Sequence, residues 1–200
     1  MLDYEKKYQG KLIAGIDEAG RGPLAGPVVC ACVIMPLDED KIIEGINDSK
    51  KLTEKKREVL YNKIIENAIA YTIVEIDEEC IDDINILNAT KLGMKKALEG
   101  LKVKPDIVLI DAVKIDTEIK QENIIKGDAL SYNIASASIL AKVYRDRKMI
   151  ELDKIYPQYG FAKHKGYGTS AHIEALKEFG KSKFHRESFI KNFEIDKKIS

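Results

Sequence analysis

Short apolar stretches in the first part of the chain give way to longer helical patterns, with polar loops between them. Apolar runs at 11–17 and 28–35 and an alternating segment at 70–76 predict three early strands. Two more strands are predicted at 107–111 and 123–126. The run at 107–111 is apolar until its final aspartate, which is typical of an interior strand covered on both faces.

Helical periodicity accounts for most of the remaining chain. Thr53 is a suitable N-cap for the first helix, and Pro105 ends the second helical pattern. Strands that first come as a group and then alternate with helices predict an α/β fold, a central mixed β-sheet flanked by helices. The predicted helices cover about 53–67, 88–101, 132–152, 169–179 and 187–198, and the last two form a C-terminal helical extension at about 170–200.

The composition is that of an ordinary globular protein. The 200 residues are 44% hydrophobic and 33% charged, which supplies enough apolar material for a core. No apolar run reaches membrane-spanning length and the N-terminus lacks a signal-peptide core, so we expect a cytoplasmic protein without a membrane partner. Cys30, Cys32 and Cys80 are an odd number without a ligand cluster, which favours reduced thiols over a disulfide or a zinc site.

The net charge of zero hides an asymmetry along the chain. Residues 161–200 carry nine basic and five acidic side chains, a local charge of +4 that the rest of the chain cancels. A basic tail beside a body with clustered acids suits a nuclease, but it also suits any solvated C-terminal helix. The charge pattern therefore limits the function classes only weakly.

Carboxylates stand at or just beyond the ends of three predicted strands. Asp17 ends the first and Glu18 follows it, Asp111 ends the fourth, and Asp128 follows the fifth. Side chains from different strands converge at the strand ends of an α/β sheet, and carboxylates that meet there repel one another unless a cation neutralises them. Oxygen ligands suit Mg²⁺ and Mn²⁺, so the pattern predicts a site for one of these ions. Asp128 has a second interpretation, since either it or Ser131 could cap the following helix.

Asp17 and Glu18 raise a geometric question because they are neighbours. Successive side chains of a strand point to opposite faces, so both carboxylates cannot aim at one point from a regular strand. Either the strand breaks between them or Glu18 reaches around with its longer side chain. Asp17 is therefore the more direct metal ligand of the two.

Other motifs for chemistry are missing or carry an ordinary interpretation. The glycines between Gly20 and Gly26 have the wrong spacing for a dinucleotide fingerprint, and a strand follows them instead of a helix. Neither a P-loop nor a Gly-x-Ser-x-Gly elbow is present. Lys142 and Asp146 have the spacing of a surface ion pair on a helix. The histidines lie in polar segments where exposed side chains are expected: His164, His172 and His185.

Seven stretches, in the same order along the chain, resemble the bacterial ribonuclease HII family. They cover most of the chain, and the first of them alone is highly specific. They read GIDEAGRGPLAGPVV (15–29), NDSKKLT (47–53), LNATKLGM (87–94), VLIDA (108–112), KGDALSYNIASASILAKVYRDRKM (126–149), YGFAKHKGYGT (159–169) and SKFHRESF (182–189).

The resemblance implies an RNase H-like fold, as a single RNase H type-2 domain over 1–200. It implies an endonuclease that cuts the RNA strand of RNA–DNA hybrids and nicks duplex DNA 5′ of a single embedded ribonucleotide. Two divalent ions, Mn²⁺ or Mg²⁺, would assist in-line attack and leave 5′-phosphate and 3′-hydroxyl ends. One ion is expected without substrate and two with it. The family's catalytic, metal-binding acids fall on Asp17, Glu18, Asp111 and Asp128.

The same resemblance assigns groups that contact the substrate. Its Gly-Arg-Gly motif falls on Gly20, Arg21 and Gly22, and its junction-sensing tyrosine falls on Tyr167. The glycines would bring main-chain groups close to the ribose, whose 2′-hydroxyl distinguishes RNA from DNA. We expect a monomer whose basic side chains contact phosphates, namely Lys163, Lys165, Lys181, Lys183 and Arg186.

Two other functions remain as alternatives. One is a different metal-dependent nuclease of the same fold, such as a junction resolvase. The other is a non-catalytic hybrid-binding protein, against which the four acids argue, because a binder of polyanions has no reason to place acids against phosphate.

Overall fold

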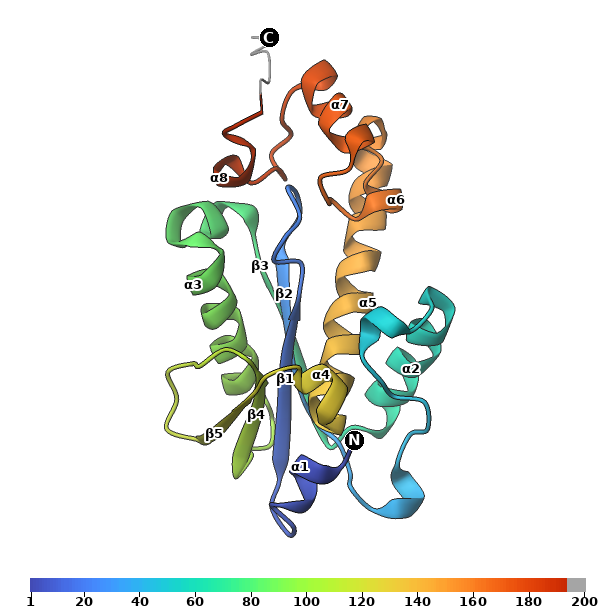
Figure 1. Cartoon of the computed structure of the whole chain (residues 1–200), viewed down its shortest axis with the longest axis vertical. Helices are drawn as coiled ribbons and strands as arrows, with labels where there is room; N and C mark the ends of the chain where they lie inside the picture. Colours follow the sequence, from blue (N-terminus) through green and yellow to red (C-terminus); the bar gives the residue numbers. More distant parts are fainter. Residues whose placement is uncertain (194–200) are drawn as a thin grey trace.

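A five-stranded mixed sheet forms the centre of the computed structural model, which describes residues 1–193 (Figure 1). The strand order is β3-β2-β1-β4-β5, with antiparallel pairing of β1 to β2 and of β2 to β3, and parallel pairing of β1 to β4 and of β4 to β5. The predicted mixed α/β sheet is confirmed. The strands are β1 Ile13–Ala19, β2 Val28–Ile34, β3 Ala70–Ile76, β4 Ile107–Asp111 and β5 Lys120–Ile124.

Helices cover both faces of this sheet. The long helix α3 packs on one face, while α5 and α2 pack on the other (Figure 1). Cys30 and Cys32 are fully buried in β2, as their apolar surroundings predicted. None of the helices formed by residues 1–193 is long and apolar enough to cross a membrane. The helices are α1 Asp3–Lys6, α2 Glu54–Asn67, α3 Glu78–Glu99, α4 Gly127–Leu130, α5 Tyr132–Ile155, α6 Phe161–His164, α7 Ser170–Phe179 and α8 Glu187–Ile190.

Several predicted boundaries differ from the observed ones. β1 continues to Ala19, two residues beyond the predicted end, because its pairing with β2 extends to that residue. The helix predicted at 88–101 begins at Glu78, with a kink at Asn85, whose φ of 66° is left-handed. The helix predicted at 187–198 ends at Ile190, and the remainder of that prediction from 194 lies outside the described residues.

The start of α5 is fixed directly against the sheet. A Cβ on Gly15 of β1 would lie 2.2 Å from the carbonyl carbon of Asn133, so the first turn of α5 sits where that strand carries no side chain. Ser131, not Asp128, caps the helix and donates from Oγ to the buried Glu5 at 2.6 Å. This close approach brings the middle of α5 alongside the acidic end of β1.

The C-terminal segments meet the connection between β1 and β2 at one end of the sheet (Figure 1). The main-chain N–H of Leu24 donates to Gly166 O at 2.8 Å, and that of Gly26 donates to Phe184 O at 2.9 Å. The N–H of Arg186 donates to Leu24 O at 2.9 Å. The β1–β2 connection is therefore bound on both sides by parts of the chain about 140 to 160 positions away.

Candidate active site

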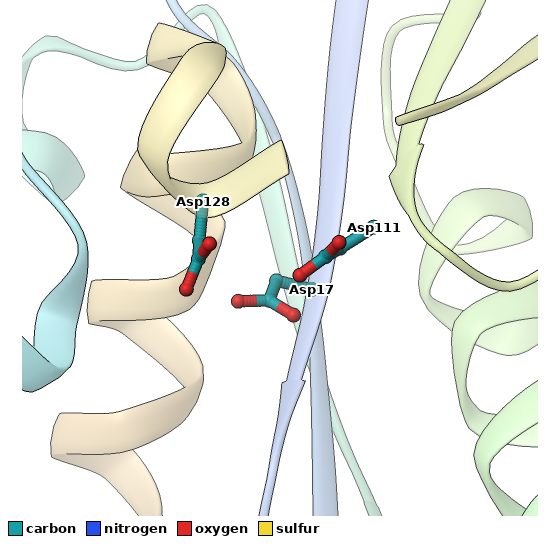
Figure 2. A group of neighbouring side chains, drawn as sticks. All are labelled: Asp17, Asp111 and Asp128. Carbon is teal, nitrogen blue, oxygen red and sulfur yellow. The ribbon is translucent and has the colours of Figure 1, made fainter. Parts of the chain in front are cut away.

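Three aspartates converge beside the sheet (Figure 2). Asp17 lies on β1, Asp111 ends β4 and Asp128 lies on α4, and one carboxylate oxygen from each falls within 4.8 Å of the others. β1 and β4 are parallel with Ile16 opposite Ile110, so the next residue of each strand points to the same face. The N–H of Gly127 donates to Asp111 Oδ1 at 3.1 Å, which ties α4 to the end of β4 and brings Asp128 over the pair.

Glu18 approaches this cluster from a different direction. Its strand continues without a break, so its side chain leaves β1 on the face opposite to that of Asp17. One oxygen, Oε1, lies 3.5 Å from Nη1 of Arg21, while Oε2 is buried and has no hydrogen-bond partner among the described residues. Asp17 is thus the more direct member of the adjacent pair, and Glu18 offers one unpaired oxygen.

The electrostatics of the cluster favour a bound cation. Burial, followed by the nearby charge of Glu18, raises the pKa of Asp17 well above its usual value. Burial, followed by Asp48 and Asp111, also raises the pKa of Asp128. Hard oxygen ligands, mutual repulsion and the unpaired Oε2 of Glu18 together fit a divalent ion of the Mg²⁺ or Mn²⁺ type.

A cleft of about 210 Å³ lies next to the aspartates. Lys50 connects the two, since its Nζ lies 3.7 Å from Asp128 Oδ2 and its side chain also lines the cleft. Ser49 and Ser138 line it too, and their hydroxyl groups share a 2.8 Å hydrogen bond. The other lining residues are Glu18, Ala19, Gly20, Arg21, Gly22, Lys142 and Tyr167.

Arg186 holds the Gly20–Gly22 loop from beneath. It is fully buried and donates to the carbonyls of Gly20, Arg21 and Gly26 at 2.6, 3.0 and 2.7 Å. The prediction that Arg186 contacts phosphate is therefore wrong, because its donors are bound to the main chain. Burial, followed by the charge of Arg145, lowers its pKa to about 9. Both loop carbonyls face this guanidinium, so the trans peptide planes turn the N–H groups of Arg21 and Gly22 away from it.

Tyr167 lies across the cleft from this loop. Its side chain is 46% exposed, and its Cε1 would lie 3.8 Å from a Cβ placed on Gly22. The guanidinium of Arg145 sits 6.0 Å from the ring centroid. Arg145 is buried and donates to main-chain carbonyls on both loops, those of Ala25, Pro27 and Lys165. Arg145 therefore contacts both the Tyr167 ring and the β1–β2 connection, and links their positions.

The predicted basic contacts do not share one environment. Lys163 and Lys183 are exposed, whereas Lys165 is half-buried and donates to the carbonyl of Ala162. Lys181 is paired with Glu187. Two exposed lysines therefore remain without an acceptor among residues 1–193, and both are available to a phosphate.

The ion pair of Lys142 and Asp146 differs from its prediction. The two groups pair at 2.6 Å, but Asp146 is buried and also lies 3.8 Å from Arg57, while Lys142 lines the cleft. The prediction of a simple surface pair is wrong because this side of α5 faces the 47–57 segment rather than solvent.

The histidines also depart from prediction. His172 and His185 are buried at 0% and 3% exposure, and His164 is half-buried. The rings of His164 and His172 stack at 4.5 Å. The local sequence is polar, but the long-range packing of 159–186 on itself encloses these rings. The expectation of exposed histidines is therefore wrong.

Several residues that line or support the cleft were not among the predicted site residues. Ser138 and Arg145 are polar residues seven positions apart, on the buried side of α5, and that spacing is a usable signal. Lys50 gave no such signal, because a lysine in a polar loop has the pattern of a solvent-exposed residue. Only the folded chain brings it to Asp128.

Carboxylates on β1 and β4 of a mixed sheet, beside a cleft that holds basic groups, define a metal-dependent nuclease of the RNase H-like class. The family model described as Ribonuclease HII matches residues 14–192, and the chain belongs to that family. It is similar to the ribonuclease HII of Acetivibrio thermocellus, with 60% identity over 197 residues, 96% of this chain and 76% of that protein. Members of the family act on RNA–DNA hybrids and depend on divalent metal.

Solved structures support the same assignment. The RNase HII of Archaeoglobus fulgidus, from a complex with PCNA, aligns with a TM-score of 0.78 and 27% identity, over 94% of this chain and 98% of that one. The ribonuclease H2 of Pyrococcus horikoshii aligns with a TM-score of 0.74 and 29% identity, over 88% and 92% of the two chains. The RNase H-like fold expected from the sequence is thereby confirmed.

Proposed function

We propose that Asp17, Glu18, Asp111 and Asp128 together form the catalytic metal site of a ribonuclease HII that uses Mn²⁺ or Mg²⁺. The supporting observation is the convergence of three aspartates within 4.8 Å, beside the unpaired buried oxygen of Glu18. Two bound ions would activate the attacking water and stabilise the leaving oxygen. The products would be 5′-phosphate and 3′-hydroxyl ends.

The Gly20–Gly22 loop would select RNA through its main chain. The N–H groups of Arg21 and Gly22 point away from Arg186 and have no acceptor among the described residues. They can donate to a ribose 2′-hydroxyl, the group that separates RNA from DNA. Gly22 leaves this approach open, because it carries no side chain between the loop and Tyr167.

Tyr167 would place its ring against the sugar of the deoxynucleotide that follows the ribonucleotide, so that the enzyme nicks 5′ of a single ribonucleotide within duplex DNA. The half-exposed ring beside Gly22 is the contact that supports this role. Lys163 and Lys165 would contact phosphates, with Lys163 the freer of the two. All of these groups come from one chain, so we expect the enzyme to act as a monomer.

The test is cleavage of a duplex with one embedded ribonucleotide, and of a continuous RNA–DNA hybrid, with Mn²⁺, with Mg²⁺ and with neither ion. We expect metal-dependent nicking 5′ of the ribonucleotide and a strong loss of that nicking in Tyr167→Ala. Binding should weaken steeply as salt increases, because phosphate contacts displace counterions. Cleavage of branched all-DNA junctions with no nick at the ribonucleotide would instead indicate a junction resolvase, and hybrid binding without cleavage would indicate a non-catalytic protein.

A further inference from the structure

A continuous hydrogen-bonded path runs from Ser182 to the main chain of Tyr167 through two buried imidazoles. The main-chain N–H of Ser182 donates to Nδ1 of His185 at 2.9 Å. Nε2 of His185 lies 3.0 Å from Nε2 of His172, and Nδ1 of His172 lies 2.9 Å from the carbonyl oxygen of Tyr167. The path joins the loop before α7, the helix α7 itself and the segment that follows it.

The two ends of this path fix the protonation of both rings. A main-chain N–H can only donate, so Nδ1 of His185 accepts and its proton is on Nε2. That proton is donated to Nε2 of His172, which leaves the His172 proton on Nδ1, where it is donated to the carbonyl of Tyr167. Burial lowers the pKa of His172 to about 4 and that of His185 to about 3, so both rings are neutral at pH 7.

The path also reaches the opposite wall of the cleft. His185 is bridged to Ala25 of the β1–β2 connection and is followed at once by Arg186. Arg186 in turn holds the carbonyls of Gly20 and Arg21. A displacement at either histidine would therefore change the separation between the Tyr167 ring and the Gly20–Gly22 loop.

We propose that His172 and His185 are positioning residues, which set the Tyr167 ring against the Gly20–Gly22 loop and thereby determine the preference for a single ribonucleotide flanked by DNA. This inference rests on the proposed role of Tyr167 and deepens it. Neither imidazole touches substrate, since both are enclosed by protein. A continuous hybrid has no RNA–DNA junction at the tyrosine, so its cleavage depends much less on the position of this ring.

Two amide substitutions of His172 distinguish a role in positioning Tyr167 from a role in packing alone. In His172→Asn, the side-chain amide can replace Nδ1 and still donate to Tyr167 O, although His185 loses its acceptor. In His172→Gln, the amide reaches the Nε2 position, so it retains a partner for His185 and leaves Tyr167 O without this donor. Both variants remove one aromatic ring from the same pocket and so serve as matched controls for packing.

The readout is kcat/KM on the single-ribonucleotide duplex divided by kcat/KM on the continuous hybrid, together with the melting temperature. We expect His172→Gln to lower this ratio roughly tenfold to a hundredfold, as for a misplaced contact group. His172→Asn should stay within about threefold of wild type on the same scale. Equal ratios in both variants and wild type, or equal losses on both substrates that follow the melting temperature, would overturn the inference.

Tyr167→Ala separates failure of this inference from failure of the proposed function. If Tyr167→Ala keeps the wild-type ratio, the role of Tyr167 itself is wrong. If Tyr167→Ala loses the preference while His172→Gln keeps it, only the positioning by histidine is wrong. Imidazole ¹⁵N shifts of the wild-type protein test the path even if a variant fails to fold. We expect a proton on Nδ1 of His172 and on Nε2 of His185, and the opposite tautomers would overturn the inference.

Discussion

The site has two sides, called here the sheet wall and the loop wall, that are built in contrasting ways. On the sheet side, Asp17, Asp111 and Asp128 crowd within 4.8 Å, and Lys50 is the neighbouring cation at 3.7 Å from Asp128. On the loop side, buried cationic and imidazole groups bind main-chain carbonyls: Arg145, Arg186 and His172. The first wall concentrates like charges, whereas the second satisfies polar groups within the protein.

This contrast separates two requirements of the site. Crowded carboxylates are unfavourable alone and become favourable when a divalent cation is bound, so the sheet wall gains stability from its ligand. A loop that recognises a ribose must be held in its binding conformation before the substrate arrives. Buried guanidinium groups hold it there, because each offers several hydrogen-bond donors in a fixed plane. Substitutions on the two walls should therefore have different effects.

The largest expected effect is on the sheet wall. Asp17→Asn should lower cleavage of an RNA–DNA hybrid by at least ~100-fold, because a neutral amide cannot replace the carboxylate as ligand and charge. Without metal, the same variant should be more stable than wild type by on the order of 1 kcal/mol, since it relieves repulsion with Glu18 and Asp111. Initial cleavage rates and denaturant unfolding measure the two effects.

A matched control for this variant is Asp116→Asn, which changes an exposed carboxylate paired with Lys95 and should retain wild-type activity. Saturating Mn²⁺ should raise the stability of the wild type by about 2.7 kcal/mol at a hundred times its dissociation constant. It should raise that of Asp17→Asn much less. A variant that cleaves as fast as wild type would remove Asp17 from the metal site.

The next prediction contrasts two glycines of the loop wall, one needed for stability and one for cleavage. Gly20→Ala should destabilise the fold by about 1–3 kcal/mol, because Gly20 has a φ of 95° and a Cβ there would lie 2.0 Å from Nε of Arg145. Gly22→Ala should leave stability within about 0.5 kcal/mol, since its Cβ would meet nothing nearer than Tyr167 at 3.8 Å. It should nevertheless lower cleavage roughly tenfold by filling the space meant for the ribose.

Thermal melting and hybrid cleavage, measured for both glycine variants, decide this comparison. A stable and fully active Gly22→Ala protein would show that the ribose does not approach the loop there.

The two walls should also respond to pH in opposite directions. The pKa of His172 and His185 falls from 6.5 to about 4 and about 3 on folding. The unfolded chain therefore binds more protons below pH 6.5, and stability should fall on acidification by at most about 1.4 kcal/mol per pH unit for each histidine. The raised pKa of Asp17 acts the other way, because its folded form retains a proton above pH 3.8 and loses stability as pH rises.

Denaturant unfolding at pH 7, 6 and 5 without metal measures this pH dependence. His172→Asn should flatten the loss of stability on acidification, whereas Asp17→Asn should steepen it. Identical slopes in wild type and His172→Asn would show that the buried imidazole does not titrate as its environment requires.

The strand pattern was predicted more accurately than the helix ends. Apolar runs identified β1, β2 and β4, and an alternating segment identified β3, because a strand covered on one or both faces needs a side-chain pattern that the local sequence carries. The fifth strand was predicted at 123–126 but lies at Lys120–Ile124, because pairing with β4 rather than an apolar pattern defines it. The start of α3 was missed, since the kink at Asn85 interrupts its helical period. The end of β1 at Ala19 was missed because pairing with β2, not local propensity, extends it.

The sequence by itself determined which groups are available for chemistry. It identified the aspartates at strand ends and the preference for Asp17 over Glu18, because alternation along a strand is a local property. It also carried the motifs that identify the family. The tertiary structure alone decided which polar side chains are buried. Arg186 and His185 enter the core only because their segment pairs with the β1–β2 connection about 160 residues earlier, and burial at such a distance leaves no local pattern.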